Sequence, residues 1–418
     1  MSLTKSKKST AFLTCEVLII GGGLVGAAQA ISLAVSGVDV CVVDHINPQS
    51  GLGTEFDGRT SAIALATQRV LQNIGVWKKL GANPAPIKDI RVTDGSSLFF
   101  LHYDHRDLGD DPFGYIVENR HMRQALMSRL TELPNVQIIA PAKVQTLTRA
   151  SNAAEAHLED GHVIKAQLII AAEGRHSPTR DSAGIRLTQW SYKQTAIVCS
   201  VNMEHSHDFI AHEHFLPAGP FAILPLNGDG PKCLGNRASI VWTERDDLAD
   251  VMVGLSDDEF KFEFDQRFGD FLGDTNIVGP RWRYPLSLQF AESCTSKRLA
   301  LVGDASHGMH PIAGQGLNMG LRDVAALTEV IDSAKKAGTD LGAASILENY
   351  ERWRRFDNTM MLVATDFLNR VFSNNIMPIK LARDFGLAAV NNMPSLKKIF
   401  MRHAMGEIGK LPKLMRGE

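Results

Sequence analysis

The sequence predicts a mixed α/β fold with a parallel sheet, an inserted β-rich segment and C-terminal helices. Three observations predict it. An apolar strand at 17–20 meets a glycine turn and an alanine-rich helix, a second strand near residue 300 meets another glycine-rich helix start, and segment 186–290 is rich in strand-forming residues. With 418 residues, the chain is long enough for two to three domains.

The first unit has the features of a Rossmann-like dinucleotide-binding motif. Gly21, Gly23 and Gly26 fit the G-x-G-x-x-G pattern, which needs a tight turn, a close approach of the backbone to a pyrophosphate, and close packing of helix on strand. Gly37 is expected to end the helix. The next strand, 40–43, ends at Asp44, an acidic residue placed to accept hydrogen bonds from an adenosine ribose.

The second glycine cluster favours FAD over NAD. The strand at 298–302 ends at Gly303 and Asp304, and a further turn with Gly314 and Gly316 opens a helix at about Leu317. A carboxylate there can bind a polyol, and a helix N-terminus can face a ring system that carries partial negative charge. FAD has an extended ribityl polyol and NAD has none. Arg59 is a further candidate contact for a phosphate or the flavin edge.

Composition and charge exclude several classes of protein. Lys and Arg number 44 against 46 Asp and Glu, which argues against nucleic-acid binding by bulk charge. The uncharged run 17–38 contains five glycines, and strand, turn and helix explain it better than a membrane span. The five cysteines have no C-x-x-C spacing and are expected to be reduced thiols of a cytoplasmic protein.

The β-rich segment is expected to carry the substrate. Strands are predicted at 195–201, 211–216 and 238–243. Four apolar residues are candidates to line a pocket, and for each of them an ordinary place in the sheet core is an equal alternative: Phe215, Phe221, Leu224 and Pro225. Two H-x-H pairs lie nearby, but no cysteine accompanies them, so no metal site is predicted.

The C-terminal tail is basic. Residues 380–418 hold eight basic and three acidic residues, a net charge of +5, interleaved with apolar side chains. This pattern suits peripheral docking on an anionic membrane surface or on a partner protein, whereas a solvated face over ordinary helical packing is the alternative. The expected location is a bacterial cytoplasm, with peripheral contact to the inner membrane.

Taken together, these motifs resemble class A flavoprotein monooxygenases of the para-hydroxybenzoate hydroxylase fold. Within that group the chain is similar to the ubiquinone-biosynthesis hydroxylases that act on 2-polyprenylphenols, a branch indicated by the tail around 394–412. The resemblance maps cofactor-binding roles onto both glycine clusters and onto four further residues: Asn119, Arg123, Glu173 and Gly174. The family normally has Asp at the position of Glu173, which bears on the docking of the reductant more than on FAD.

The resemblance also implies the domain organisation. The FAD-binding domain is expected to comprise 1–75, 105–185 and 295–340, the β-rich substrate domain 76–104 and 186–294, and the C-terminal helical region 341–418.

The implied reaction is hydroxylation of a polyprenylated phenol by O2 through a flavin C4a-hydroperoxide, with NAD(P)H or a partner reductase as electron source. Catalytic positions at the flavin ring would be Pro311, Gly316, Leu317 and Asn318. Two alternatives are a related FAD-dependent reductase or dehydrogenase and a non-catalytic flavoprotein of a biosynthetic complex. The ring position, the prenyl length and any substrate-ionising base are not determined by the sequence.

Overall fold

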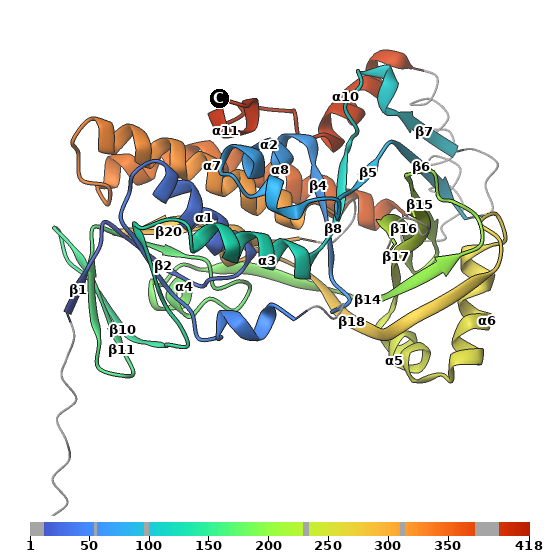
Figure 1. The fold of residues 1–418 in the computed structure, drawn as a ribbon, viewed down its shortest axis with the longest axis horizontal. Coiled ribbons are helices and arrows are strands. Elements are labelled where there is room, and N and C mark those ends of the chain that lie inside the picture. Colours follow the sequence, from blue (N-terminus) through green and yellow to red (C-terminus); the bar gives the residue numbers. More distant parts are fainter. Residues whose placement is uncertain (1–11, 54–56, 96–99, 229–233, 310–313, 373–392) are drawn as a thin grey trace, which may run out of the picture.

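The computed structural model describes the chain except for residues 1–11, 54–56, 96–99, 229–233, 310–313 and 373–392. Figure 1 shows two sheet-containing halves joined by long strands and covered by C-terminal helices. Among the described residues, no helix has the length and apolar character needed to cross a bilayer.

One half is built on a six-stranded sheet. Its order is β19 (Thr295–Ser296), β20 (Leu299–Leu301), β13 (Leu168–Ala171), β2 (Val17–Ile20), β3 (Val40–Val43) and β9 (Val136–Ile139). All neighbours are parallel except β19 and β20. Every residue of β2, β3 and β13 is buried. This explains their continuous apolar sequences, because parallel strands are covered on both faces.

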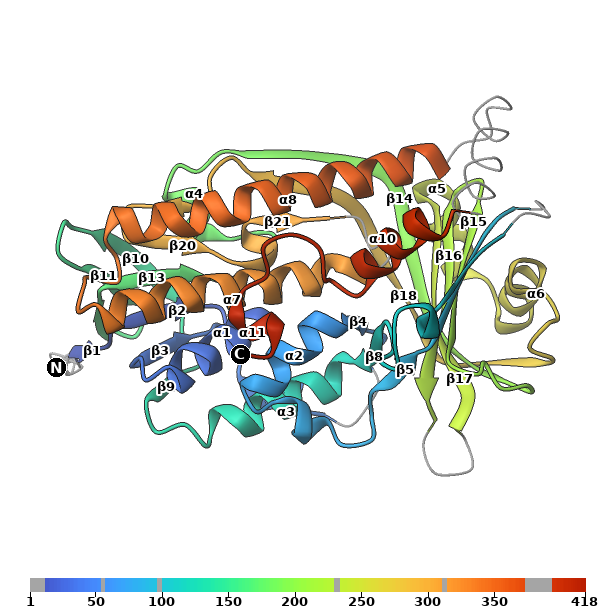
Figure 2. The same cartoon turned by 90° about the horizontal axis from the view of Figure 1, so that it is seen from above.

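Helices cover this sheet. They include α1 (Leu24–Val35), α3 (Asn119–Leu130), α7 (Gln315–Lys336) and α8 (Ala344–Phe372). Figure 2 shows α7 and α8 running side by side across the molecule. The predicted end of the first helix is confirmed, since Gly37 follows α1 with a φ of 79°.

The other half is an eight-stranded sheet. Its order is β21 (His307–Gly308), β18 (Thr275–Ala291), β14 (Leu187–Met203), β17 (Leu234–Arg245), β16 (Gly219–Asn227), β15 (Ile210–Leu216), β6 (Asp89–Asp94) and β7 (Phe100–Asp104). The three strands predicted here are confirmed within β14, β15 and β17. Helices α5 (Asp246–Gly254) and α6 (Asp257–Phe268) cover one face through a cluster of large aromatic side chains.

Two smaller sheets accompany the two large ones. A three-stranded sheet joins β4 (Thr60–Ala64), β8 (Gly114–Glu118) and β5 (Ala85–Ile87), and a four-stranded sheet joins β1 (Phe12–Thr14), β12 (Val163–Ala166), β11 (Ala154–Leu158) and β10 (Val144–Arg149). Two short helices complete this part, α2 (Leu65–Asn73) and α4 (Pro178–Ser182). The hydroxyls of Thr60 on β4 and Ser239 on β17 lie 3.1 Å apart and link the halves.

The described C-terminal elements dock on the body. Helix α10 (Pro394–Ala404) buries Met401 beside Leu65 and Leu226, and α11 (Lys413–Arg416) buries Met415 beside Ala66. The opposite side of α10 leaves Ile399 and Phe400 exposed. The tail is therefore partly packed and partly open to an external surface.

A buried charge network fixes the second glycine turn. Asp323 of α7 is fully buried and accepts hydrogen bonds from the Gly303 backbone at 2.9 Å, His307 Nε2 at 2.6 Å and Arg354 Nε of α8 at 2.7 Å. Burial alone would raise the pKa of Asp323, yet its cationic neighbours hold that pKa below its usual range. Neither Asp323 nor Arg354 is marked by a motif in the sequence.

Candidate functional site

The first glycine turn leaves room for a ligand at one position and none at the others. A Cβ at Gly26 would lie 1.9 Å from the Gly21 carbonyl oxygen, and a Cβ at Gly21 would lie 2.5 Å from the oxygen of Ala172. A Cβ at Gly23, the N-cap of α1, would meet nothing within 4 Å. Gly21 and Gly26 therefore permit the tight contact of helix and strand, and Gly23 faces open space at a helix N-terminus.

The second turn repeats this arrangement. Gly314 caps α7 in the left-handed conformation with a φ of 62°, and a Cβ at Gly316 would meet nothing within 4 Å. Gly303 also has a positive φ, 60°, and donates its N–H to Asp323. Gly303 thus shapes the turn that presents Asp304, while Gly316 and Leu317 border open space.

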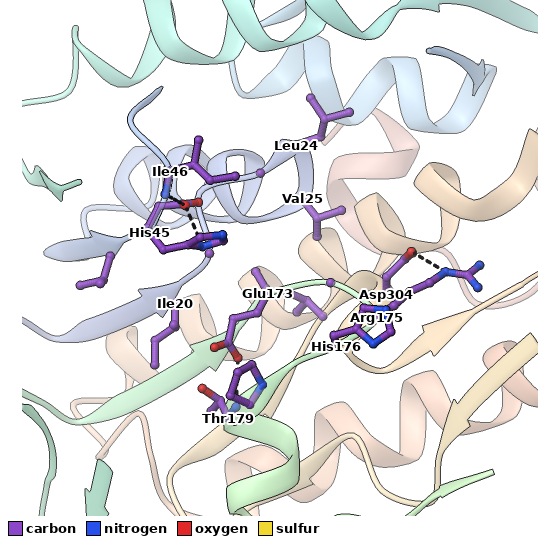
Figure 3. A pocket seen from close by; sticks show the side chains of 18 of the residues that line it. Ile20, Leu24, Val25, His45, Ile46, Glu173, Arg175, His176, Thr179 and Asp304 are labelled. Atoms are coloured by element: carbon purple, nitrogen blue, oxygen red, sulfur yellow. Dashed lines mark hydrogen bonds and ion pairs between the residues drawn. The ribbon is translucent and has the colours of Figure 1, made fainter. Parts of the chain in front are cut away.

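Both turns open onto a single cavity of about 1330 Å³. Figure 3 shows Leu24 and Val25 of α1 on one side and Asp304 with Arg175 on another. The cavity is lined by many of the predicted cofactor-binding residues and by two of the predicted catalytic ones: Gly21, Gly23, Asp44, Arg59, Asn119, Glu173, Gly174, Asp304, Gly314, Gly316 and Leu317.

Acidic side chains lie at two separate turns that border the cavity. Asp44 accepts a hydrogen bond from the Gly22 backbone at 2.5 Å and from the Ile46 backbone at 2.7 Å, so its carboxylate is oriented against the first turn. Asp304 lies at the second turn, with Oδ2 3.3 Å from Arg175 Nε. Arg175 also donates to Ser287 Oγ and to the Met309 carbonyl, an anchoring role that the sequence does not reveal.

Glu173 has a local structural role at the cavity wall. Its Oε2 accepts hydrogen bonds from Ser177 Oγ at 2.6 Å and from the Thr179 backbone at 3.2 Å, at the start of α4. Gly174, with a φ of 79°, would direct a Cβ into open space. The backbone at Gly174 is therefore the part of this motif that can approach a ligand most closely.

Two predicted residues have other roles in the structure. Arg123 does not line the cavity and instead donates to the Gly51 carbonyl at 2.9 Å and to Asp57 Oδ2 at 2.7 Å, which secures the loop before β4. Asn318 is buried, and its amide is used by the backbone of Ala62, Ala64 and Gly314. Asn318 is therefore a positioning residue, and neither prediction of direct contact is supported.

The remaining predicted residues lie in different parts of the structure. Pro311 lies outside the described residues. Phe221 packs among Trp242, Phe260 and Phe264 on the sheet face that α5 and α6 cover, so its assignment to a substrate pocket is wrong. Phe215 stacks on Phe372 with ring centroids 4.1 Å apart, on the opposite face. Leu224 is half-buried on that same face, and Pro225 is buried in β16.

The histidine pairs are occupied by ordinary contacts. His207 accepts a hydrogen bond from the Phe209 backbone and donates to the Leu226 carbonyl, and His214 lies 2.5 Å from Thr93 Oγ1. Burial lowers the pKa of His212 to about 4. In the described parts of the chain, the only residues that converge as metal ligands do are Asp89, Asp104 and His105, a set that includes none of these paired histidines.

The cavity meets the requirements of FAD. Open space at Gly23, Gly174 and Gly316 would accept a ligand in close contact with backbone. The N-termini of α1 and α7 border the cavity, where they can stabilise anionic groups of a ligand. Asp44 and Asp304 supply acceptors at two turns, as a molecule with both a ribose and a ribityl chain needs. The fold and the donor set therefore fit the cofactor that the sequence predicts.

Comparison with known proteins decides the family. A family model described as "FAD binding domain" matches residues 14–361. The chain belongs to this family of FAD-binding proteins. It is 50% identical to the ubiquinone hydroxylase UbiL of Rhodospirillum rubrum, over 100% of this chain and 96% of the relative, and 33% identical to the 3-demethoxyubiquinol 3-hydroxylase of Escherichia coli K12, over 94% and 98%.

A solved structure confirms the fold. The p-nitrophenol 4-monooxygenase PnpA of Pseudomonas putida superimposes with a TM-score of 0.77 at 18% identity, covering 96% of this chain and 100% of that one. The resemblance to FAD-dependent monooxygenases of the ubiquinone-biosynthesis branch is confirmed by these relatives, and FAD is the cofactor.

Proposed function

We propose that this protein hydroxylates the aromatic ring of a polyprenylated phenol in ubiquinone biosynthesis, with FAD as cofactor and O2 as oxidant. The observation that carries the proposal is the convergence of two glycine-rich helix starts on one cavity, in a chain half identical to a ubiquinone hydroxylase along its full length. When bound, FAD supplies the activation of oxygen, with electrons from NAD(P)H or a partner reductase.

The residues of the first turn bind and orient the cofactor. The backbone at Gly23 and the N-terminus of α1 accommodate the pyrophosphate, and the Asp44 carboxylate accepts hydrogen bonds from the adenosine ribose. Asp304 does the same for the ribityl chain, while Arg175 and the buried Asp323 fix the turn that carries it. This binding sets the position of the ring relative to the substrate.

The N-terminus of α7 provides the electrostatic contribution. Its free N–H groups and the positive end of the helix dipole stabilise negative charge at the ring edge facing Gly316 and Leu317. Asn318 holds this helix start against β4 through two hydrogen bonds, with the backbone of Ala62 and Ala64, and a third hydrogen bond joins it to the Gly314 carbonyl of its own N-cap. The sheet face that carries Phe215 and Leu224 offers an apolar wall that excludes water from the reacting centre.

Analysis of cellular lipids tests the proposal. A strain that lacks the gene is expected to accumulate a prenylated precursor with one hydroxyl group fewer than the next quinone intermediate, identified by mass spectrometry of lipid extracts. Re-expression of the intact chain should remove that precursor. An unchanged quinone pool, or a precursor that differs in the saturation of its prenyl chain, would instead favour the reductase alternative.

Peripheral membrane contact through α10 is a second part of the proposal. The exposed side of this helix combines Ile399, 55% exposed, and Phe400, 45% exposed, with the basic residues Lys398 and Arg402. Apolar insertion together with attraction to anionic lipid headgroups is the usual basis of interfacial helix binding. A polyprenylated substrate dissolves in the bilayer, so such contact would shorten its path to the site.

Vesicle binding tests this contact. The double variant Ile399→Ser and Phe400→Ser is expected to bind phosphatidylglycerol vesicles at least about tenfold more weakly, because it loses most of its insertable apolar area. Phe262→Ser on α6 is the matched control, since Phe262 is 63% exposed on another helix. Equal sedimentation of the double variant and the intact protein with these vesicles would contradict the contact.

A further inference from the structure

The two faces of the eight-stranded sheet have different neighbours. Trp242 and Phe221 face α5 and α6. Ser239 points to the opposite face, because side chains alternate along β17, and its hydroxyl lies 3.1 Å from that of Thr60. Thr60 lines the cofactor cavity. This second face of the sheet is therefore the one directed toward the flavin.

Glu213 lies on that cofactor-facing side. On β15 it shares a face with Ala211 and Phe215. Ala211 belongs to the apolar cluster of that face, and Phe215 stacks on Phe372, which packs against the cluster. Its partners across the neighbouring strands are apolar, Ala222 on β16 and Val92 on β6. Two strand spacings, about 10 Å, separate β15 from β17 and its Ser239, a span that one aromatic substrate ring and its hydroxyl can bridge.

The Glu213 carboxylate has no hydrogen-bond or ion-pair partner among the described residues. Other carboxylates in the interior differ: Glu118 is paired with Arg120, and Glu351 accepts hydrogen bonds from Ser293 and Cys294. Glu213 nevertheless retains accessible surface. Placing a carboxylate among apolar groups without a partner costs folding free energy. A carboxylate that is found in such a place is therefore a candidate for a functional role.

Among the described residues, the other charged and titratable groups near Glu213 lie on neighbouring strands and on α10. Asp94 and Tyr103 lie on β6 and β7, Arg237 on β17 lies 3.6 Å from Glu118, and His403 is on α10. Burial raises the pKa of Tyr103 above its usual range and lowers that of His403, so both are neutral near pH 7.

We propose that Glu213 accepts the proton of the substrate's phenolic hydroxyl during ring hydroxylation. This inference rests on the proposed function. The O–H bond breaks and its proton passes to the Glu213 carboxylate, which leaves a phenolate whose ring carbon forms the new bond to oxygen. The ring carbon then loses its hydrogen as a proton, and Glu213 returns the first proton to the phenolic oxygen. The electrons come from the reduced cofactor and the new ring oxygen from O2. The second oxygen atom leaves as water, with the proton released by the ring carbon and one from the reduced cofactor.

The surroundings adapt the carboxylate to this role. Burial raises the pKa of Glu213 to about 7, which brings it closer to the value of about 10 typical of a phenol. The ionised form is then present at neutral pH among apolar side chains, where a stronger base favours proton transfer from the substrate. Activity should therefore rise with pH through about 7 as Glu213 ionises.

The test is Glu213→Gln in the FAD-loaded protein. At pH 7 the rate of hydroxylated product formation should fall about 100-fold, because a positioned base contributes about that factor or more. The pH at which this rate increases should shift from about 7 toward the pKa of the phenol itself, near 10. Reduction of the flavin, measured by bleaching of its visible absorbance, should keep its rate. Glu213→Asp should restore part of the product formation.

Stability distinguishes a base from a structural residue. A carboxyl group whose pKa is raised on folding destabilises the fold as pH rises above its unfolded value, so Glu213→Gln should melt at the same or a higher temperature at pH 8. Glu155→Gln on β11, a half-buried strand position in another sheet, is the control and should leave the rate and its pH profile unchanged.

The outcomes separate this inference from the proposed function. Hydroxylation by the wild-type chain together with an unaltered rate and pH profile in Glu213→Gln would overturn the role of Glu213 and leave the function standing. Absence of hydroxylation by the wild-type chain would overturn the proposed function itself. A Glu213→Gln protein that loses its FAD or melts at a lower temperature at pH 8 would also count against the proposal, since it would show a structural role.

Discussion

Gly23→Val is expected to fold and to lose FAD. Gly23 has a φ of −65°, which valine adopts without strain, and a Cβ there would meet no protein atom within 4 Å. The branched side chain would instead occupy the space where the pyrophosphate approaches the backbone. The affinity for FAD should fall at least about 100-fold, equivalent to roughly 3 kcal/mol of binding free energy.

Flavin fluorescence titration measures this loss, and far-UV circular dichroism verifies the fold. Gly254→Val is the matched control, because a Cβ at Gly254 also meets nothing within 4 Å and lies in α5, outside the cavity. Gly26→Ala should behave differently and lose both fold and cofactor, since its Cβ would overlap the Gly21 carbonyl. FAD bound by Gly23→Val with wild-type affinity would show that the pyrophosphate lies elsewhere.

Asp323→Ala should cause the largest loss of stability. It leaves the fully buried Arg354 without its partner and deprives Gly303 N–H and His307 of their acceptor. Removing one member of a buried ion pair costs about 3–5 kcal/mol. The free energy of unfolding in urea measures this cost. Asp332→Ala on the same helix, which removes an exposed pair with Lys336, should change it by less than about 0.5 kcal/mol.

The same network predicts that the stability of the fold decreases at acidic pH. The pKa of Asp323 is lower in the folded state than in the unfolded chain. Its contribution to stability is therefore complete above the unfolded value, about 3.9, and is lost as pH falls through the folded value. Asp323→Ala should show a smaller loss of stability than the wild type over that acid range. Equal loss in both proteins would contradict this assignment.

The elements closest to the cofactor could be predicted because their sequence signals are local. Gly21, Gly23, Gly26 and Asp44 lie within one strand–turn–helix–strand unit, so spacing alone orders them around one turn. The second helix start at Gly314 and Gly316 is equally local. Three strands of the inserted sheet were predicted by their β-branched and aromatic residues. Strand β14 extends well beyond the run that marked it, and β18 was not predicted.

Other features depend on contacts that spacing does not encode. Phe221 and Leu224 lie three positions apart in one strand, so alternation places them on opposite faces, but only the folded sheet shows which of these faces α5 and α6 cover. Asp323 and Arg354 are 31 positions apart and meet because α7 and α8 lie together. Glu213 sits in a strand that alternates ordinarily, so its lack of a partner becomes visible only when the neighbouring strands are in place.

With FAD bound between the two turns, the protein is proposed to hydroxylate a prenylated phenol with oxygen from O2. The most direct measurement supplies purified, FAD-loaded protein with a reductant, a short-chain prenylphenol and isotopically labelled oxygen gas, and follows the product by mass spectrometry. We expect a product that carries one labelled oxygen atom on its aromatic ring. A product that is reduced or dehydrogenated without label would contradict this expectation.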